Sequence, residues 1–279
     1  MLVKWSKDLE IGVPFVDADH KVLINLLNQV DNCITEQEET TVLGSVLEAL
    51  VSYTDYHFTR EEKLLELAGY AAIDEHKDVH QMLFHKVRAI YHSFFADRES
   101  VRVDDVRSFL QSWLTSHILV EDAKYRDACI DKADAATQAG MIPFIHTNGS
   151  HVPFDEWGLL RVLLVDDNPN FGKLISTILK AVGITNIEVT QTPSEGLALM
   201  SRRPADVILC DWVMDEMTGT EFAAKMGEME IPSRVVMLTG YSVDTLQSKV
   251  TSANISAYLE KPVNAHDLLD VITRTTFNA

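Results

Sequence analysis

Long uninterrupted apolar segments are absent from this sequence of 279 residues. A membrane-spanning helix needs about 20 consecutive apolar residues, and no window of the chain approaches that length. The N-terminal stretch MLVKWSKDLE also lacks the apolar core of a secretion signal. We therefore expect a cytoplasmic protein that does not associate with membranes.

Cysteine and basic residues are both scarce. The three cysteines, Cys33, Cys129 and Cys210, are widely spaced and form no CxxC pair, which predicts buried thiols rather than disulfides or a thiolate metal site. Lys and Arg number 24 against 42 Asp and Glu, so the formal net charge is −18. Because this charge repels phosphate backbones and anionic lipids, we expect no direct binding to nucleic acid.

Proline is missing between Pro14 and Pro143, and in most of this stretch apolar residues recur every three or four positions. Such spacing is typical of amphipathic helices, and short polar joints favour antiparallel neighbours. The sequence therefore predicts an all-α up-down four-helix bundle over residues 1–132, with residues 1–16 as an extended arm packed on it. The four helical segments lie at residues 22–30, 42–58, 80–95 and 106–119.

The pattern changes twice after residue 132. Residues 133–158 lose the periodicity and collect glycine and proline, so we assign them to a linker, whose apolar side chains could dock on a domain. Residues 159–279 alternate short β-branched runs with helical segments, one of them at 243–253. Five strands, each followed by a helix, predict an α/β domain with a doubly wound parallel five-stranded sheet.

Histidines recur in all four predicted helices, and in the second and fourth helices a carboxylate accompanies them. A single His/Glu pair four residues apart is more often a surface pair or a core residue than a metal site, but several such pairs on consecutive helices favour a metal. Imidazole and carboxylate together suit iron, and carboxylates that bridge two cations reduce their repulsion. The seven candidate ligands are His20, His57, Glu61, His76, His80, His117 and Asp122.

The step from His117 to Asp122 does not fit an ideal helix. Five residues turn about 140° beyond a full circle, so we expect a distorted turn, such as a π-bulge, between the two. Glu62, next to Glu61, points about 100° away and is predicted to be solvated. The other histidines are predicted to be ordinary polar residues: His85, His92, His146, His151 and His266.

A second constellation lies at the predicted strand ends of residues 159–279. Asp166 and Asp167 follow the first strand and Asp211 ends the third, so three carboxylates meet at the carboxyl edge of the sheet. Clustered carboxylates need a cation, and Mg²⁺ prefers oxygen ligands. Thr239 and Lys261 follow the fourth and fifth strands, where a hydroxyl and an ammonium group can receive phosphoryl oxygens. The alternative is an α/β scaffold with acidic loops and no site. The order of these residues at the ends of the first, third, fourth and fifth strands argues against that alternative.

The first 130 residues resemble the bacterial hemerythrin-like domains in the Trp5 arm and in DADH, YxxHFxxEE, GY, HxxxH and HIxxxD. The resemblance implies a non-haem, oxo- or hydroxo-bridged di-iron centre that binds O2 reversibly, on the iron with fewer ligands. That iron would be held by His20 and His57. Residue by residue, it further implies His76, His80 and His117 on the other iron, with Glu61 and Asp122 as bridges.

The last 120 residues resemble the receiver domain of two-component response regulators, a flavodoxin-like fold. The resemblance implies Asp211 as the phosphoacceptor and Thr239 and Lys261 as phosphoryl contacts. Tyr258 matches the switch aromatic of the family, and Asp215 replaces its usual proline. It also implies Mg²⁺ on Asp166, Asp167, Asp211 and the backbone carbonyl of Val213.

Together the two halves predict a response regulator in which oxygen or redox state at the di-iron site is coupled to phosphorylation of Asp211. The expected partners are a sensor histidine kinase or phosphotransfer protein and a downstream protein target, with a homodimer possible. Alternatives are an O2 carrier localised by its receiver, or a sensor of iron, nitric oxide or peroxide. We do not expect an enzyme. Oxygen-activating di-iron enzymes typically have carboxylate-rich ligand sets, whereas five of the seven candidate ligands here are histidines.

Overall fold

The structure is a computed structural model, and it describes residues 1–36, 38, 40–97, 103–144, 154–241 and 254–277. The chain divides into two compact units, Met1–Phe144 and Ile145–Ala279. The first unit is helical and the second is a parallel α/β sheet, so both predicted fold classes are confirmed.

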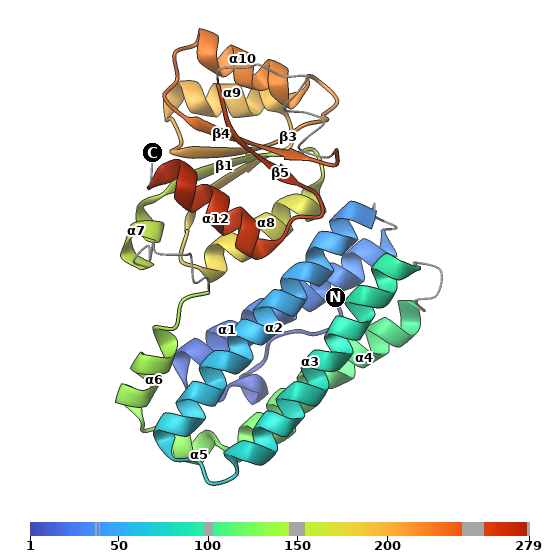
Figure 1. The fold of residues 1–279 in the computed structure, drawn as a ribbon, viewed down its shortest axis with the longest axis vertical. Coiled ribbons are helices and arrows are strands. Elements are labelled where there is room, and N and C mark those ends of the chain that lie inside the picture. Colours follow the sequence, from blue (N-terminus) through green and yellow to red (C-terminus); the bar gives the residue numbers. More distant parts are fainter. Residues whose placement is uncertain (37, 39, 98–102, 145–153, 242–253, 278–279) are drawn as a thin grey trace. The chain divides into compact units, whose positions relative to one another are not determined.

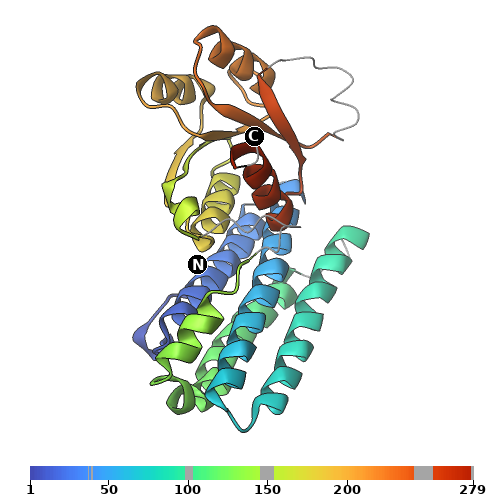
Figure 2. The ribbon, with the colours of Figure 1, turned by 60° about the vertical axis from the view of Figure 1, so that its left-hand side comes forward.

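The first unit is a bundle of four long helices (Figure 1, Figure 2). Helix α1 packs against α2 and α4, and α2 also packs against α3, as in an up-down bundle. Its interior holds fully buried leucines, among them Leu23, Leu27, Leu50 and Leu64. The helices are α1 (Pro14–Thr35), α2 (Thr40–Ala68), α3 (Ile73–Ala96) and α4 (Val103–Ser116).

The N-terminal arm packs on the bundle, as predicted, but it ends at Val13. Pro14 begins α1, because the fixed φ of proline and its missing N–H suit the first helical position. The arm contains a short 3₁₀ turn, η1 (Lys7–Leu9). The side chain of Asn28 accepts from the backbone N–H of Val3 at 3.0 Å and donates to its carbonyl at 2.8 Å, which ties the arm to α1.

The region that the sequence assigns to a linker is structured at both ends. Helix α6 (Ala133–Gly140) packs against α2 through buried Ala135 and Ala139, and residues up to Phe144 belong to the first unit. A short helix, α7 (Phe154–Leu159), lies within the second unit. The sequence pattern missed α6 because alanine and glycine give almost no apolar periodicity. Residues 145–153 of the predicted linker lie outside the described residues.

The second unit is a five-stranded sheet of order β2-β1-β3-β4-β5 in which all pairs are parallel. Helices α8 and α12 cover one face of the sheet, and α9 and α10 cover the other (Figure 1). The strands are β1 (Arg161–Val165), β2 (Asn186–Thr190), β3 (Val207–Asp211), β4 (Arg234–Thr239) and β5 (Ile255–Glu260). The described helices on them are α8 (Pro169–Ala181), α9 (Pro193–Arg202), α10 (Gly219–Glu228) and α12 (Ala265–Thr276). The helix predicted at 243–253 lies outside the described residues.

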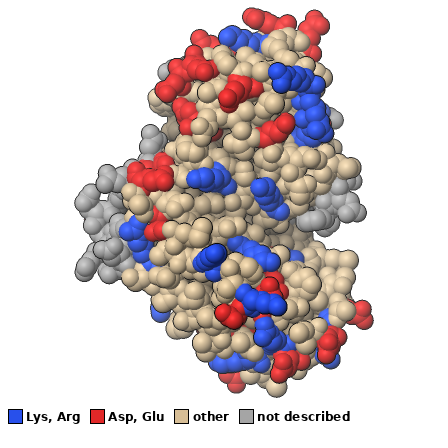
Figure 3. Space-filling model, turned by 180° about the vertical axis from the view of Figure 1, so that it is seen from behind, with Lys and Arg blue, Asp and Glu red and all other residues tan. Residues whose placement is uncertain are grey.

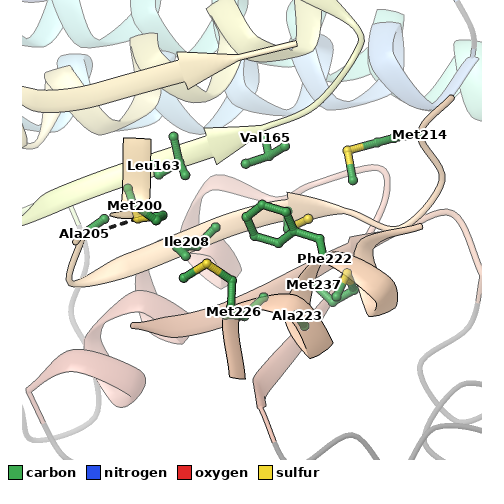
Figure 4. Packing of buried hydrophobic residues seen from close by; sticks show 12 residues of the cluster. Leu163, Val165, Met200, Ala205, Ile208, Met214, Phe222, Ala223, Met226 and Met237 are labelled. Carbon is green, nitrogen blue, oxygen red and sulfur yellow. Dashed lines mark hydrogen bonds between the residues drawn. The ribbon is translucent and has the colours of Figure 1, made fainter. Parts of the chain in front are cut away.

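The core between the sheet and helices α9 and α10 is built around Phe222, which is fully buried (Figure 4). Met200 and Met226 come from the two helices, and Val165 and Met237 come from strands β1 and β4. Flexible methionine side chains fill the irregular space between the sheet and the helices. This packing holds the carboxyl ends of β1, β3 and β4 at fixed spacing.

Candidate metal centre and phosphoacceptor site

The seven side chains predicted to bind metal all lie inside the helical bundle. None is more than 4% exposed, although five are histidines and two are carboxylates. They come from α1, α2, α3 and the segment that follows α4. Burying so many polar groups without compensation is costly, which points to a bound cation rather than to packing.

The seven side chains form two groups that share a carboxylate. In the first group one ligand atom of each residue lies within 4.8 Å of the others, and its members are Glu61, His76, His80, His117 and Asp122. The second group is His20, His57 and Glu61. Asp122 spans both groups as well, because its Oδ2 lies 3.2 Å from His20 Nε2 and its Oδ1 lies 3.1 Å from His117 Nε2. Each carboxylate therefore stands between two sets of imidazoles.

The turn between His117 and Asp122 is a π-helix, η3 (His117–Glu121), which confirms the predicted distortion. The backbone N–H of Asp122 donates to the carbonyl of His117, five residues back. Because a π turn takes more residues than an α turn, it returns Asp122 to the face that carries His117. The chain then continues through a 3₁₀ turn, η4 (Asp122–Lys124), and a short helix, α5 (Arg126–Cys129).

Many ring and carboxylate atoms of this site lack hydrogen bonds. Both nitrogens of His20 and His117 and both oxygens of Asp122 are buried without a hydrogen-bond partner among the described residues. Each such atom costs about 1–3 kcal/mol unless something satisfies it. Nitrogen and oxygen donors in this mixture suit iron, so the residues present fit two metal ions held between them.

The pKa values of the buried groups in this site are shifted in opposite directions. Burial and the neighbouring His57 lower the pKa of His20 to about 3. Burial also lowers the pKa of His57, but the carboxylates of Asp19 and Glu61 outweigh this effect and raise the pKa to about 9. The pKa of Asp122 is raised well above its usual value by burial and by Glu61. Burial also raises the pKa of Glu61, but the surrounding histidines dominate and hold it well below its usual value. The neutral imidazole of His20 has a lone pair available to a cation.

Two outer carboxylates support the histidines, and the sequence reasoning missed both. Glu62 was predicted to be solvated, but its Oε1 lies 2.8 Å from His80 Nδ1, because His80 reaches it from the adjacent helix α3. Asp19 is 2% exposed, and its Oδ2 lies 3.6 Å from His57 Nδ1. Carboxylates in such positions orient metal-binding histidines. A search of the sequence for acids beside each candidate histidine would have found Asp19.

The second unit brings its predicted acidic residues together at the sheet edge. Asp166, Asp167 and Asp211 form a group whose oxygens lie within 4.8 Å of one another. Lys261 follows β5, and its Nζ lies 3.0 Å from Asp166 Oδ2 and 2.8 Å from Asp211 Oδ1. The ammonium group also lies 4.1 Å from the centroid of the Phe171 ring, which holds it over the carboxylates.

This cluster perturbs the acids within it. Burial and the neighbouring Asp211 raise the pKa of Asp166 to about 6, although Lys261 opposes the shift. The pKa of Asp167 is raised by burial and by the charges of Asp211 and Asp215. Asp215, which stands where receivers usually have proline, thus adds a repelling charge to the site. These shifts describe a pocket that favours a divalent cation.

The other residues predicted for this site lie on or shortly after strands β3, β4 and β5. Thr239 ends β4 and is fully buried, and its Oγ1 accepts from the backbone N–H of Tyr241 at 2.9 Å. Tyr258 lies on β5 beside Met237 of β4 and is partly buried. The side chain of Val213 is 59% exposed, and no described contact tests its carbonyl as a ligand.

On the face drawn in Figure 3, acidic and basic side chains are interspersed on each unit. None of the described helices combines the length and apolar character needed to cross a bilayer.

Comparison with known proteins matches each unit to a family. Residues 11–129 match the hemerythrin HHE cation-binding domain, and residues 162–273 match the response regulator receiver domain. The chain is 36% identical to a bacteriohemerythrin of Stenotrophomonas maltophilia over 126 residues, which is 45% of this chain and 80% of that protein. It is 35% identical to a bacteriohemerythrin of Pseudomonas aeruginosa over 124 residues, 44% of this chain and 79% of the relative.

A solved CheY-like receiver domain from Methanospirillum hungatei is 31% identical, with a TM-score of 0.40, and the match covers 43% of this chain and 95% of that one.

The protein belongs to the hemerythrin family, with a response regulator receiver domain fused after its hemerythrin domain.

Proposed function

We propose that this protein is a two-component response regulator in which O2 binding at a di-iron centre is coupled to phosphorylation of Asp211. The observation that carries the first half is the buried set of imidazole and carboxylate atoms without hydrogen-bond partners in the bundle. Five histidines and two carboxylates would hold two iron ions, which in the ferrous state would supply the electrons for binding O2.

The division of the seven residues favours O2 binding on one side. His76, His80 and His117 form one group with both carboxylates, whereas only His20 and His57 accompany the shared carboxylates on the other side. The ion on the second side would have fewer protein ligands and therefore a free position. Since each of the seven side chains is at most 4% exposed, the bundle shields the site from bulk water, which favours a small ligand such as O2.

The receiver chemistry is proposed for the acidic pocket of the second unit. An oxygen of Asp211 attacks the phosphorus of a phosphohistidine on a partner kinase or phosphotransfer protein, so an O–P bond forms while the P–N bond breaks. Lys261 Nζ, 2.8 Å from Asp211 Oδ1, offsets charge on the transferred group. Mg²⁺ held by Asp166, Asp167 and Asp211 would neutralise the phosphoryl oxygens. The hydroxyl of Thr239 stands at the adjacent strand end to receive one of them.

The coupling is tested by following Asp211 phosphorylation in the full chain with a small phosphoryl donor. The iron-loaded protein is compared in the anaerobic ferrous, O2-exposed and fully oxidised forms, and Asp211→Asn serves as the blank. We expect the phosphorylation rate to differ between the forms. Equal rates in all three forms, together with equal binding of a cognate kinase, would refute the coupling.

Storage or delivery of O2 is a second candidate function, and the deep burial of the site favours it. A shielded site slows loss of electrons to solvent oxidants, which suits a carrier better than a sensor. The rate of autoxidation in air separates the two, since slow autoxidation with no effect on phosphorylation supports carriage. Parallel titrations with nitric oxide and peroxide would identify a different physiological ligand.

A further inference from the structure

The exit segment, which we define as residues 140–144, is the last described stretch of the first unit, and it is bound to one face of α2. Arg60 donates from Nη2 to the carbonyl of Gly140 at 2.9 Å. The hydroxyl of Tyr56 donates to the carbonyl of Ile142 at 3.1 Å. Two hydrogen bonds from α2 therefore hold the chain as it leaves helix α6.

The same face of α2 contacts a buried carboxylate, Asp19 of α1. Asp19 accepts from the hydroxyl of Tyr53 at 2.8 Å and from Arg60 Nη1 at 2.8 and 3.0 Å. The ring of Phe144 stacks on that of Tyr53, with centroids 5.7 Å apart. Both donors to Asp19 thus also contact the exit segment. The planar guanidinium of Arg60 makes the link rigid, because Nη1 donates to Asp19 while Nη2 donates to the carbonyl of Gly140.

The carboxylate of Asp19 also faces His57. Its Oδ2 lies 3.6 Å from His57 Nδ1, while the opposite ring atom, Nε2, lies 2.9 Å from Glu61 Oε2. A proton on Nδ1 directed at Asp19 leaves the Nε2 lone pair for a metal ion. Since 3.6 Å exceeds hydrogen-bond length, a small movement of the ring decides whether that bond forms.

We propose that Asp19 is a positioning residue for His57 and that Arg60 transmits the position of this pair to the exit segment. The proposal rests on the proposed di-iron centre, because a metal ion at His57 Nε2 is what moves the ring. Occupation of the site draws Nδ1–H and Asp19 into a hydrogen bond. Arg60 follows the carboxylate, and its bond to Gly140 changes with it. The exit segment, where the chain leaves the first unit, therefore reports the state of the metal site.

The alternative is a static ion pair that only fastens α6 to α2. Such a pair stabilises the fold equally in all states of the site. The two explanations differ in whether the exit segment responds when the site is loaded. Amide exchange measures this directly, because Met141 N–H donates to Thr137 at 3.1 Å and Ile142 N–H donates to Ala139 at 3.2 Å, and opening these bonds sets their exchange rates.

The test is hydrogen–deuterium exchange of the full chain by mass spectrometry, with and without ferrous iron under anaerobic conditions. We expect exchange in a peptide covering residues 138–144 to change on iron loading. Arg60→Lys should still bind iron, yet lose the change, because the contacts described for the Arg60 guanidinium are with Asp19, Gly140 and two aromatic rings rather than with a predicted ligand of the metal. Asp19→Asn should weaken binding of the iron held by His20 and His57 about 10-fold to 100-fold, since outer carboxylates tune metal affinity by that factor.

Two further variants keep the result interpretable. Arg88→Lys is the matched control, because Arg88 is exposed on α3 and contacts only the ring of Phe84, at 5.6 Å, among the interactions described for it. It should behave as the wild type. Tyr56→Phe removes one hydrogen bond to Ile142 without touching Asp19, and should reduce the exchange difference even where Arg60→Lys folds poorly.

The outcomes separate this proposal from the proposed function. An unchanged peptide in iron-loaded wild type, or an unchanged response in folded Arg60→Lys, overturns the link through Arg60. Wild-type iron affinity in Asp19→Asn overturns its positioning role. If the exit segment responds but the phosphorylation rate of Asp211 does not, the link stands and the coupled signalling function fails.

Discussion

The ring of Phe58 lies parallel to the imidazole of His80, with centroids 3.7 Å apart and an angle of 8° between the planes. Phe58 also meets the ring of His117 at 5.5 Å, nearly edge to face. One buried aromatic ring on α2 therefore positions two predicted ligands that come from α3 and from the segment after α4. The apolar wall of the metal site and its ligand geometry depend on the same residue.

Replacing this ring tests its part in the fold. Phe58→Ala should lower the free energy of unfolding of the first unit by about 3–5 kcal/mol, since it removes a ring that is only 5% exposed. Calorimetry of the iron-free chain measures the change. Phe95→Ala is the matched control, because Phe95 is 44% exposed and should cost far less. Equal losses for the two variants would contradict the role given to Phe58.

The carboxylate of Glu62 should be needed for tight metal binding. Glu62→Gln weakens its contact with His80 Nδ1, and the affinity for iron should fall about 10-fold to 100-fold, as for other carboxylates that support metal-binding histidines. Competition with a ferrous chelator gives the affinity. Glu66→Gln, which affects an exposed pair with Lys63 on the same helix, should leave it unchanged.

Iron loading should stabilise the bundle much more than it stabilises the receiver. A ligand that binds only the folded state adds about 4 kcal/mol when its free concentration is a thousand times its dissociation constant. The thermal transition of the first unit should therefore rise on loading and fall again with a chelator. His117→Ala should abolish most of this rise. A rise of the same size in that variant would argue against the assigned site.

Magnesium binding to the receiver should depend on pH through Asp166. Its pKa is raised to about 6, first by burial, so this acid becomes protonated in the folded protein as pH falls through 6 and then cannot hold a cation. Affinity should be nearly constant above pH 7 and fall below pH 6, by up to about tenfold per unit. Fluorescence of Trp212, next to Asp211, provides the readout. An affinity that is the same at pH 7.5 and pH 5 would contradict this reasoning.

Gly219 at the start of α10 should tolerate no side chain. A Cβ there would lie 2.4 Å from the carbonyl oxygen of Asp211 and 2.5 Å from Met237 Sδ, and the backbone carbonyl cannot move aside. Gly219→Ala should destabilise the second unit by about 1–3 kcal/mol and disturb the end of β3 at Asp211. Urea unfolding measures the loss. Gly240→Ala is the matched control and should cost much less, because an added Cβ there meets no atom within 4 Å among the described residues beyond its chain neighbours.

The sequence by itself determined the two fold classes and the elements that carry the predicted sites. Helical spacing placed His57 and Glu61 on one face of α2, and strand ends placed Asp166 and Asp211 at one sheet edge, because local periodicity fixes which face or edge a residue occupies. The distorted turn before Asp122 was also predicted, because residues five apart do not share one face of an ideal α-helix, and the structure shows that it is a π turn.

Only the tertiary structure decided which side chains from different helices meet. The contact of Glu62 with His80 and the chain of contacts from His57 through Asp19 and Arg60 depend on how α1, α2 and α3 approach one another, and side-chain reach of several ångströms has no signature in local spacing. Helix α6 likewise emerged only from packing, because its small residues bury against α2 without an apolar pattern of their own.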